Sequence, residues 1–96
     1  MTHISRRTEQ QEQARKVMEG ELVKLIRTVE EDPEAQASER LCRSYLAACS
    51  GGAVTGGPVN TKFERMVLDC NVEDQKAVRL RLNEILQNIL VLKQES

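Results

Sequence analysis

The stretch that decides the fold runs from Pro58 to Leu92 and reads PVNTKFERMVLDCNVEDQKAVRLRLNEILQNILVL. From Val72 onward its apolar residues lie three and four positions apart, which is the spacing of one helix face. Asn71 precedes the pattern and suits the N-cap, and acidic residues follow in the first turn, where the helix dipole favours them. The pattern predicts a helix from Val72 to about Lys93. Its main apolar face holds Val78, Leu82, Ile85, Leu86, Ile89 and Leu92.

The same helix carries apolar residues outside this face, at Leu80, Leu90 and Val91. A helix that is apolar on two sides needs two packing partners, and one short chain hardly supplies both. The chain has 96 residues, of which 2% are aromatic, so its core is expected to be thin. Oligomerisation is one way in which small domains complete such a core. The sequence therefore predicts an all-α bundle of three to four helices that a second copy completes as a homodimer.

A long helix is predicted near the N-terminus. Thr8 followed three residues later by Gln11 is a capping-box pattern, which begins a helix that runs to about Glu31. Apolar residues along this helix repeat every three or four positions and form a short heptad-like seam. The seam predicts either a packing face within one chain or a contact with a second copy. Its residues are Met18, Leu22, Leu25 and Val29.

Two shorter helices are predicted between the long ones. Asp32 before Pro33 suits the N-cap of the second helix, because Pro is favoured at the first helical position. Asn60 suits the N-cap of the third, which is expected to span residues 61–69. Phe63, the one Phe of the chain, is expected to anchor the core. The core-facing side of the second helix is expected to hold Ser38, Leu41, Cys42, Tyr45 (with its hydroxyl near water) and Cys49.

Two segments are predicted to lie outside the helices, within a single domain of residues 1–96. Residues 1–7 are predicted to be disordered. Residues 50–59 hold four of the five glycines and are predicted to form a flexible loop. The loop lacks the G-x-x-x-x-G-K-[ST] pattern, which argues against a phosphate-binding cradle.

Composition excludes several function classes. The 14 basic and 15 acidic residues give a net charge of -1, which argues against nucleic-acid binding. No apolar run approaches the ~20 residues of a membrane span. The one histidine, His3, has no partner for catalysis, and the three cysteines lack metal-ligand spacing, so no catalytic residue, metal or cofactor is predicted. The cysteines are expected to be small buried hydrophobic residues of a protein in a reducing compartment, which indicates a cytoplasmic location. Because no catalytic residue is predicted, the chain is expected to be a binding module.

Four pieces of the chain share their order and spacing with a known domain. They are SYLAACS at Ser44–Ser50, GPV-x-x-KF at Gly57–Phe63, C-x-x-EDQK at Cys70–Lys76 and R-L-x-x-x-L-x-N-I at Arg81–Ile89. Together they resemble the BNB ("brand new BAG") domain of the BAG co-chaperone family. In that family the domain ends a longer protein with an upstream coiled coil, so the resemblance implies that this chain is an excised domain.

The resemblance implies a function and a set of partners. Domains of this family bind the nucleotide-binding domain of heat shock protein 70 (DnaK-type) chaperones, accelerate ADP release and thereby promote client release. The BNB branch pairs two chains as a homodimer, and related domains also bind unfolded client peptides. On the positions that match this branch, the resemblance implies that chaperone binding involves Glu73, Asp74, Gln75, Lys76, Arg81 and Asn88; Arg79 is added because helix geometry places it near them.

Two alternatives remain open at this point. The chain is either a nucleotide exchange factor or a helical dimerisation and scaffold module that has no effect on nucleotide. The chaperone contact is either the last helix or the region of the glycine-rich loop and Phe63. In each case the residues expected to form the core or the dimer contact are Met18, Leu22, Leu25, Val29, Phe63, Leu82, Ile85, Leu86 and Ile89.

Overall fold

The computed structural model describes residues 7–32, 34–49 and 60–95, and in these ranges it contains α-helices and no strand. The all-α prediction is therefore confirmed for the described residues. The loop predicted at residues 50–59 lies outside them, as do residues 1–6 of the segment 1–7 that is predicted to be disordered; Arg7 is described. The helices are α1 (Glu9–Glu31), α2 (Gln36–Cys49), α3 (Thr61–Asp69) and α4 (Val72–Glu95).

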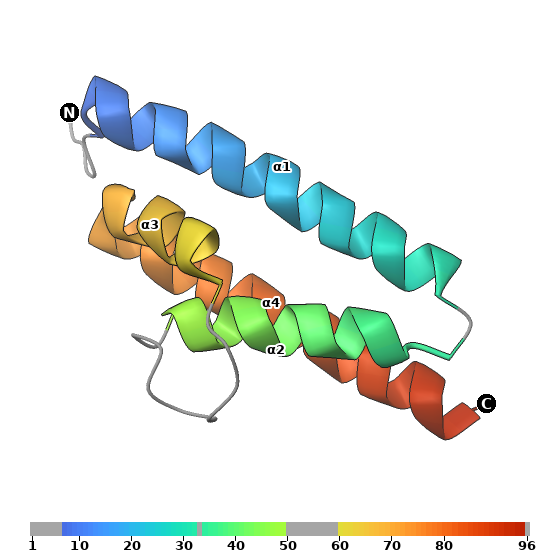
Figure 1. The fold of residues 1–96 in the computed structure, drawn as a ribbon. Coiled ribbons are helices and arrows are strands. Elements are labelled where there is room, and N and C mark those ends of the chain that lie inside the picture. Colours follow the sequence, from blue (N-terminus) through green and yellow to red (C-terminus); the bar gives the residue numbers. More distant parts are fainter. Residues whose placement is uncertain (1–6, 33, 50–59, 96) are drawn as a thin grey trace, which may run out of the picture.

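The helices form a flat and elongated bundle (Figure 1). α1 and α4 run in the same direction, α2 runs antiparallel beside α4, and α3 lies near the N-terminal ends of α1 and α4. The Cα atoms extend over 49 × 29 × 16 Å. Their radius of gyration is 14.2 Å, whereas a compact chain of this length is expected to have about 12.5 Å. Much of each helix therefore stays at the surface of the single chain.

Side-chain caps define three of the helix starts as the sequence predicts. Thr8 Oγ1 accepts a hydrogen bond from the Gln11 backbone N–H at 3.1 Å, and Gln11 Oε1 accepts one from the Thr8 N–H at 2.9 Å, which completes the capping box of α1. Asn60 Oδ1 accepts from the Phe63 N–H at 2.9 Å and caps α3. Asn71 Oδ1 accepts from the N–H three residues later at 2.8 Å and caps α4.

The start of α2 differs from the prediction. The helix begins at Gln36, three residues after the predicted first position, because Ala35 adopts a positive φ of 58° and turns the chain before the helix. The Asp32 carboxylate nevertheless caps the helix from a distance. It accepts hydrogen bonds from the Ser38 backbone N–H at 3.0 Å and the Ser38 hydroxyl at 2.8 Å. These bonds satisfy the polar groups of Ser38, which is completely buried, and they hold the pKa of Asp32 below its usual value.

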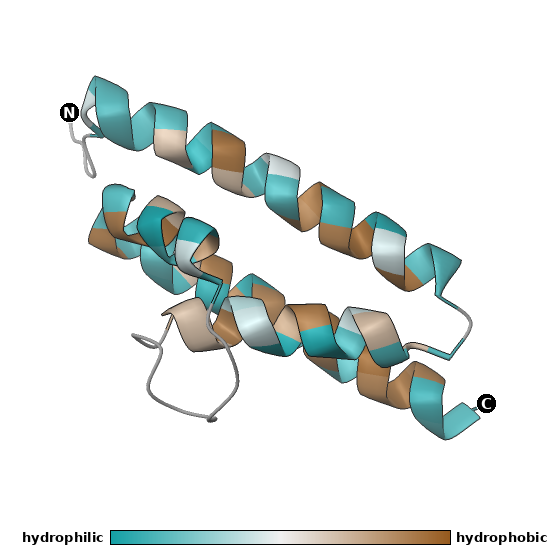
Figure 2. Ribbon diagram, in the orientation of Figure 1, coloured by the Kyte–Doolittle hydropathy of each residue, from teal (hydrophilic) through white to brown (hydrophobic). Residues whose placement is uncertain are grey.

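The core lies where α2 and α4 meet and continues beneath α1 and α3. Hydrophobic residues recur along α1 and α4 between hydrophilic ones, as Figure 2 shows. The Tyr45 and Phe63 rings stack with their centroids 4.1 Å apart, joining α2 to α3. The Tyr45 hydroxyl donates a hydrogen bond to the Glu21 carboxylate of α1 at 3.1 Å, in a contact that is only partly buried.

The residues predicted for the core or dimer contact pack mainly within one chain. Seven of the nine are buried, and Leu22 and Val29 of the α1 seam are partly buried against the same core. The seam is therefore, for the most part, an internal packing face. Leu92 was expected on the main α4 face but is 44% exposed, because it lies about 60° around the helix from Ile89. Leu80 and Val91, which were expected outside that face, are exposed.

Candidate functional site

A groove lies between α1 and α4. Its volume is about 450 Å³. α1 packs more extensively against α3 and α2 than against α4, which leaves the α1–α4 junction open. Met18 and Leu22 of α1 and Val78 and Leu80 of α4 supply the apolar part of the lining. Leu80 is 67% exposed, so this part of the lining is available to a partner.

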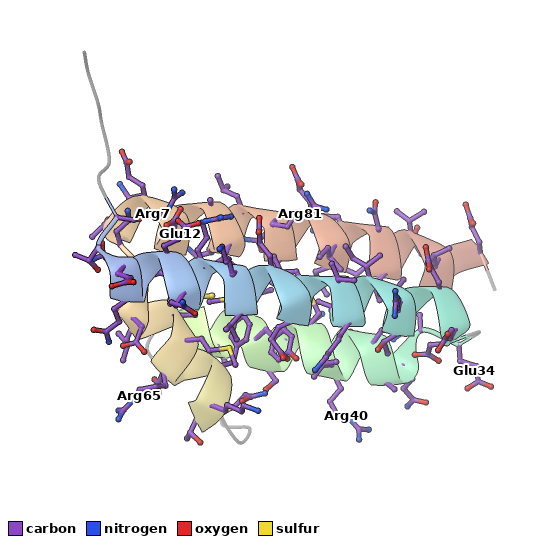
Figure 3. All side chains as sticks on the ribbon, turned by 90° about the horizontal axis from the view of Figure 1, so that it is seen from above. Arg7, Glu12, Glu34, Arg40, Arg65 and Arg81 are labelled. Atoms are coloured by element: carbon purple, nitrogen blue, oxygen red, sulfur yellow. The ribbon has the colours of Figure 1, made fainter. Side chains whose placement is uncertain are left out.

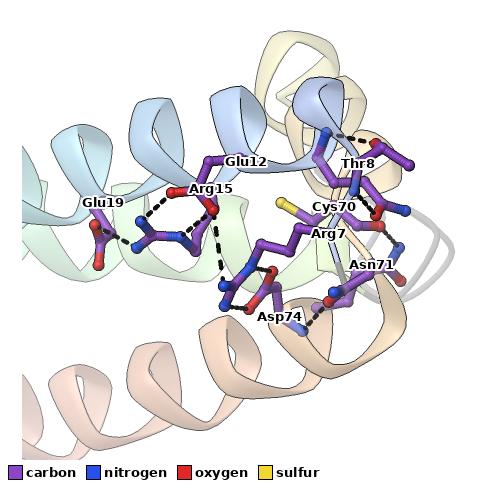
Figure 4. Close-up of polar contacts among 10 residues, drawn as sticks. Arg7, Thr8, Glu12, Arg15, Glu19, Cys70, Asn71 and Asp74 are labelled. Atoms are coloured by element: carbon purple, nitrogen blue, oxygen red, sulfur yellow. Dashed lines mark hydrogen bonds and ion pairs between the residues drawn. The ribbon is translucent and has the colours of Figure 1, made fainter. Parts of the chain in front are cut away.

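Charged residues close the N-terminal end of the groove (Figure 4). The Arg7 guanidinium donates two hydrogen bonds to the Asp74 carboxylate, from Nε at 2.6 Å and from Nη2 at 2.8 Å. Arg15 continues the network along α1, where it bonds Glu12 at 2.7 Å and pairs with Glu19 at 2.9 Å. The Arg7–Asp74 pair connects the residue before the α1 N-cap to the first turn of α4.

This network shifts the pKa of its carboxylates. The hydrogen bonds from Arg7 lower the pKa of Asp74, and the charge of Arg15 acts in the same direction. The hydrogen bond from Arg15 likewise lowers the pKa of Glu12. Both carboxylates are therefore held in the ionised form through the neutral pH range.

The lowered pKa of Asp74 predicts a pH-dependent contribution to stability. An acidic group whose pKa is depressed on folding stabilises the protein above its unfolded pKa, which is about 4, and loses that effect as pH falls through the folded pKa. Asp74→Asn should therefore be less stable than wild type at pH 7. The difference should disappear toward pH 2. Urea unfolding across this range measures it, with Glu73→Gln as the control for first-turn charge. A difference between wild type and Asp74→Asn that is independent of pH would contradict the expected role of the pair.

The end of the groove away from Asp74 carries two charged side chains of α4. Arg81 and Glu84 of α4 line the groove, and within the described part of the chain neither forms a hydrogen bond or ion pair. Figure 3 shows Arg81 projecting from the side of α4. This base and this acid lie three residues apart on α4, next to the exposed Leu80.

The seven residues expected to bind a chaperone do not lie on one face. Asp74 and Gln75 are engaged within the chain, because Asp74 pairs with Arg7 and the Gln75 amide donates to the Cys70 carbonyl at 2.9 Å. Arg81 lines the groove. The remaining residues are exposed at other angles around α4, since each residue advances about 100° around a helix. These exposed residues are Glu73, Lys76, Arg79 and Asn88.

Sequence reasoning missed the charged end of the groove. Arg7 was assigned to a disordered segment, and Asp74 to a partner surface, yet the two are paired across 67 positions. No periodicity or local motif links residues at that separation. The exposed apolar residues of α4 were found, because their helical phase differs from that of the buried face.

The described residues show neither a metal site nor a membrane-spanning helix. They contain no group of three or more His, Cys, Asp or Glu side chains placed to hold a metal ion. None of the described helices is both long and apolar enough to cross a membrane.

Comparison with known proteins adds no family assignment. No protein-family model matches this chain, and no solved structure matches it. Relation to the BAG family is therefore a proposal that stands on the residues of the four matching pieces.

Proposed function

We propose that this chain is a co-chaperone that binds the nucleotide-binding domain of heat shock protein 70 chaperones and accelerates ADP release. The observation that carries the proposal is that the four pieces of sequence resemblance meet in space. Tyr45 from SYLAACS stacks on Phe63 from GPV-x-x-KF. Cys70 of the C-x-x-EDQK piece and Leu82 and Ile89 of the last piece belong to the same core. A resemblance that concentrates in mutually packed residues supports a shared fold.

The proposed activity requires a rigid helical surface and no catalytic group. A partner that binds the open form of the nucleotide-binding domain more tightly than the closed form must weaken nucleotide affinity by the same factor. The exposed polar residues of α4, including Lys76, Arg79 and Arg81, are the candidates for contact with acidic groups of the chaperone. α4 packs against α2, its most extensive partner, which supports a fixed shape for this helix.

Release of ADP tests the proposal directly. Fluorescent ADP bound to a DnaK-type chaperone should dissociate faster when the protein is added at saturating concentration, and the affinity of the chaperone for ADP should fall by about 5- to 150-fold if the coupling is of ordinary size. Arg81→Glu should weaken chaperone binding by reversing a charge on α4. Arg65→Glu, which reverses an exposed charge on α3 near the alternative Phe63 region, is the matched control. Stopped-flow fluorescence measures release, and titration measures binding.

Each outcome of this experiment assigns the function differently. Saturated binding without faster release would contradict exchange activity and favour the scaffold module. If Arg65→Glu weakens binding and Arg81→Glu does not, the contact lies on α3 rather than α4. If neither variant changes affinity, the α4 residues named for the chaperone contact are wrong.

The homodimer belongs to the same proposal. The 16 Å thickness of the bundle and the exposed apolar residues of α4 support a second copy that covers part of this helix. Exposed apolar surface of this kind is also suited to an extended client segment, which would compete with the second copy.

The dimer predicts a specific behaviour of Leu80. Wild type should sediment as a dimer at micromolar concentration. Leu80→Asp should sediment as a folded monomer, because Leu80 is 67% exposed in the single chain and contributes little to its core. Glu84→Gln keeps the apolar surface and should remain largely dimeric, since an exposed ion pair contributes only about 0–1 kcal/mol. Analytical ultracentrifugation with circular dichroism separates loss of dimer from loss of fold, and a monomeric wild type would contradict the dimer.

A further inference from the structure

The N-terminal end of α1 is joined to α4 by charge, while α1 also packs against α3. Residues 9–13 contribute no buried side chain, and the first buried residue of the helix is Ala14. The capping box orders this end of the helix through hydrogen bonds between Thr8 and Gln11. Arg7, immediately before the cap, reaches Asp74 of α4 with two hydrogen bonds.

Cys70 lies behind this pair. It lines the same end of the groove and is 4% exposed. Figure 4 shows its sulfur beside the Arg7 side chain. Cys42 is buried elsewhere, in the contact between α2 and α4, where its thiol bonds the Leu82 carbonyl at 3.4 Å. The two thiols therefore report on different parts of the fold.

We propose that the Arg7–Asp74 pair, here called the latch, holds the N-terminal end of α1 against α4 and controls access to the Cys70 end of the groove. When the latch breaks, the first turns of α1 separate from α4 while the α2–α4 core stays intact. Local opening of this kind occurs where few apolar contacts hold a segment. The latch is a property of the fold and does not depend on the chaperone activity proposed above.

The geometry explains why charge controls this opening. The Arg7 side chain is 34% exposed and that of Asp74 is 15% exposed, so water and salt reach the pair from one side. Glu12 approaches Arg7 at 3.7 Å, and Arg15 lies on the same side of α1, where it pairs with Glu12. High salt should therefore weaken the latch, whereas the apolar contacts that begin at Ala14 are not weakened by screening.

Thiol labelling tests the latch in the folded protein. Cys49→Ser removes the partly buried third thiol, and an uncharged alkylating reagent then reports on Cys42 and Cys70, which peptide mass spectrometry distinguishes. Arg7→Gln in this background should accelerate labelling of Cys70 by about fivefold, which is the largest effect expected from the loss of a partly exposed ion pair. Labelling of Cys42 should not change. Lys24→Gln, which removes a surface ion pair with Glu21 in the second half of α1, should change neither rate.

Two further measurements keep the result unambiguous. Arg7→Gln combined with Asp74→Asn should label Cys70 no faster than the more reactive single variant, because both remove the same contact. Raising salt from about 0.05 M to about 1 M should accelerate Cys70 labelling in the Cys49→Ser protein and leave Arg7→Gln unchanged. An unchanged Cys70 rate in Arg7→Gln would overturn the latch. Equal acceleration of Cys42 would also overturn it, since that result means global destabilisation.

Discussion

Replacing Ile89 by Asn is expected to unfold most of the protein at room temperature. Ile89 is completely buried on the main face of α4. Its truncation removes packing worth about 2–5 kcal/mol, and burial of an amide without a partner adds about 1–3 kcal/mol. A domain of this size has a total stability of roughly 5–14 kcal/mol, so the loss approaches the whole of it.

Val91→Asn is the matched control for this variant. Val91 lies two residues further along the same helix and is 50% exposed, so the same change there should alter the free energy of unfolding by less than about 1 kcal/mol. Urea unfolding followed by circular dichroism measures both. A fully folded Ile89→Asn protein with near-wild-type stability would mean that the α2–α4 core is not packed as described.

Removal of the Phe63 ring is expected to have the second-largest effect. Phe63 is 1% exposed and stacks on Tyr45, which in turn bonds Glu21. The three residues therefore join α3, α2 and α1 in one contact. Phe63→Ala should lower the free energy of unfolding by about 3–5 kcal/mol, because it leaves a cavity and a stacking partner without its neighbour.

Tyr45→Phe separates the ring contact from the hydrogen bond. This variant keeps the stack on Phe63 and loses only the bond to Glu21, so it should cost about 1 kcal/mol. Thermal unfolding of both variants at one pH gives the comparison. If Tyr45→Phe were as destabilising as Phe63→Ala, the hydroxyl bond to α1, rather than ring packing, would be what joins the helices.

The sequence was a good guide to features that depend on near neighbours. The α1 capping box and the caps at Asn60 and Asn71 form as expected, because each joins residues three positions apart. The buried face of α4 was also predicted down to Ile89, because helical periodicity fixes which side chains share a face. Leu92 is the exception, since it lies at the edge of that face and is 44% exposed.

The α2 start shows where local signals fail. Asp32 before Pro33 resembles an N-cap, and the carboxylate does cap the helix, but through Ser38 rather than from the expected position. The difference arises at Ala35, which is 2% exposed and has a positive φ. A non-glycine residue rarely adopts this conformation, and here burial in the core accompanies it.

The amino-acid sequence by itself determined the helices, their caps and the identity of most buried residues, because those depend on spacings of three and four along the chain. Tertiary structure alone decided that Arg7 meets Asp74, that Gln75 is occupied by the Cys70 carbonyl, and that a groove remains between α1 and α4. These features depend on how helices lie against one another. Charged side chains carry no periodic signal of a distant partner, so their pairing emerges only when packing brings the helix ends together.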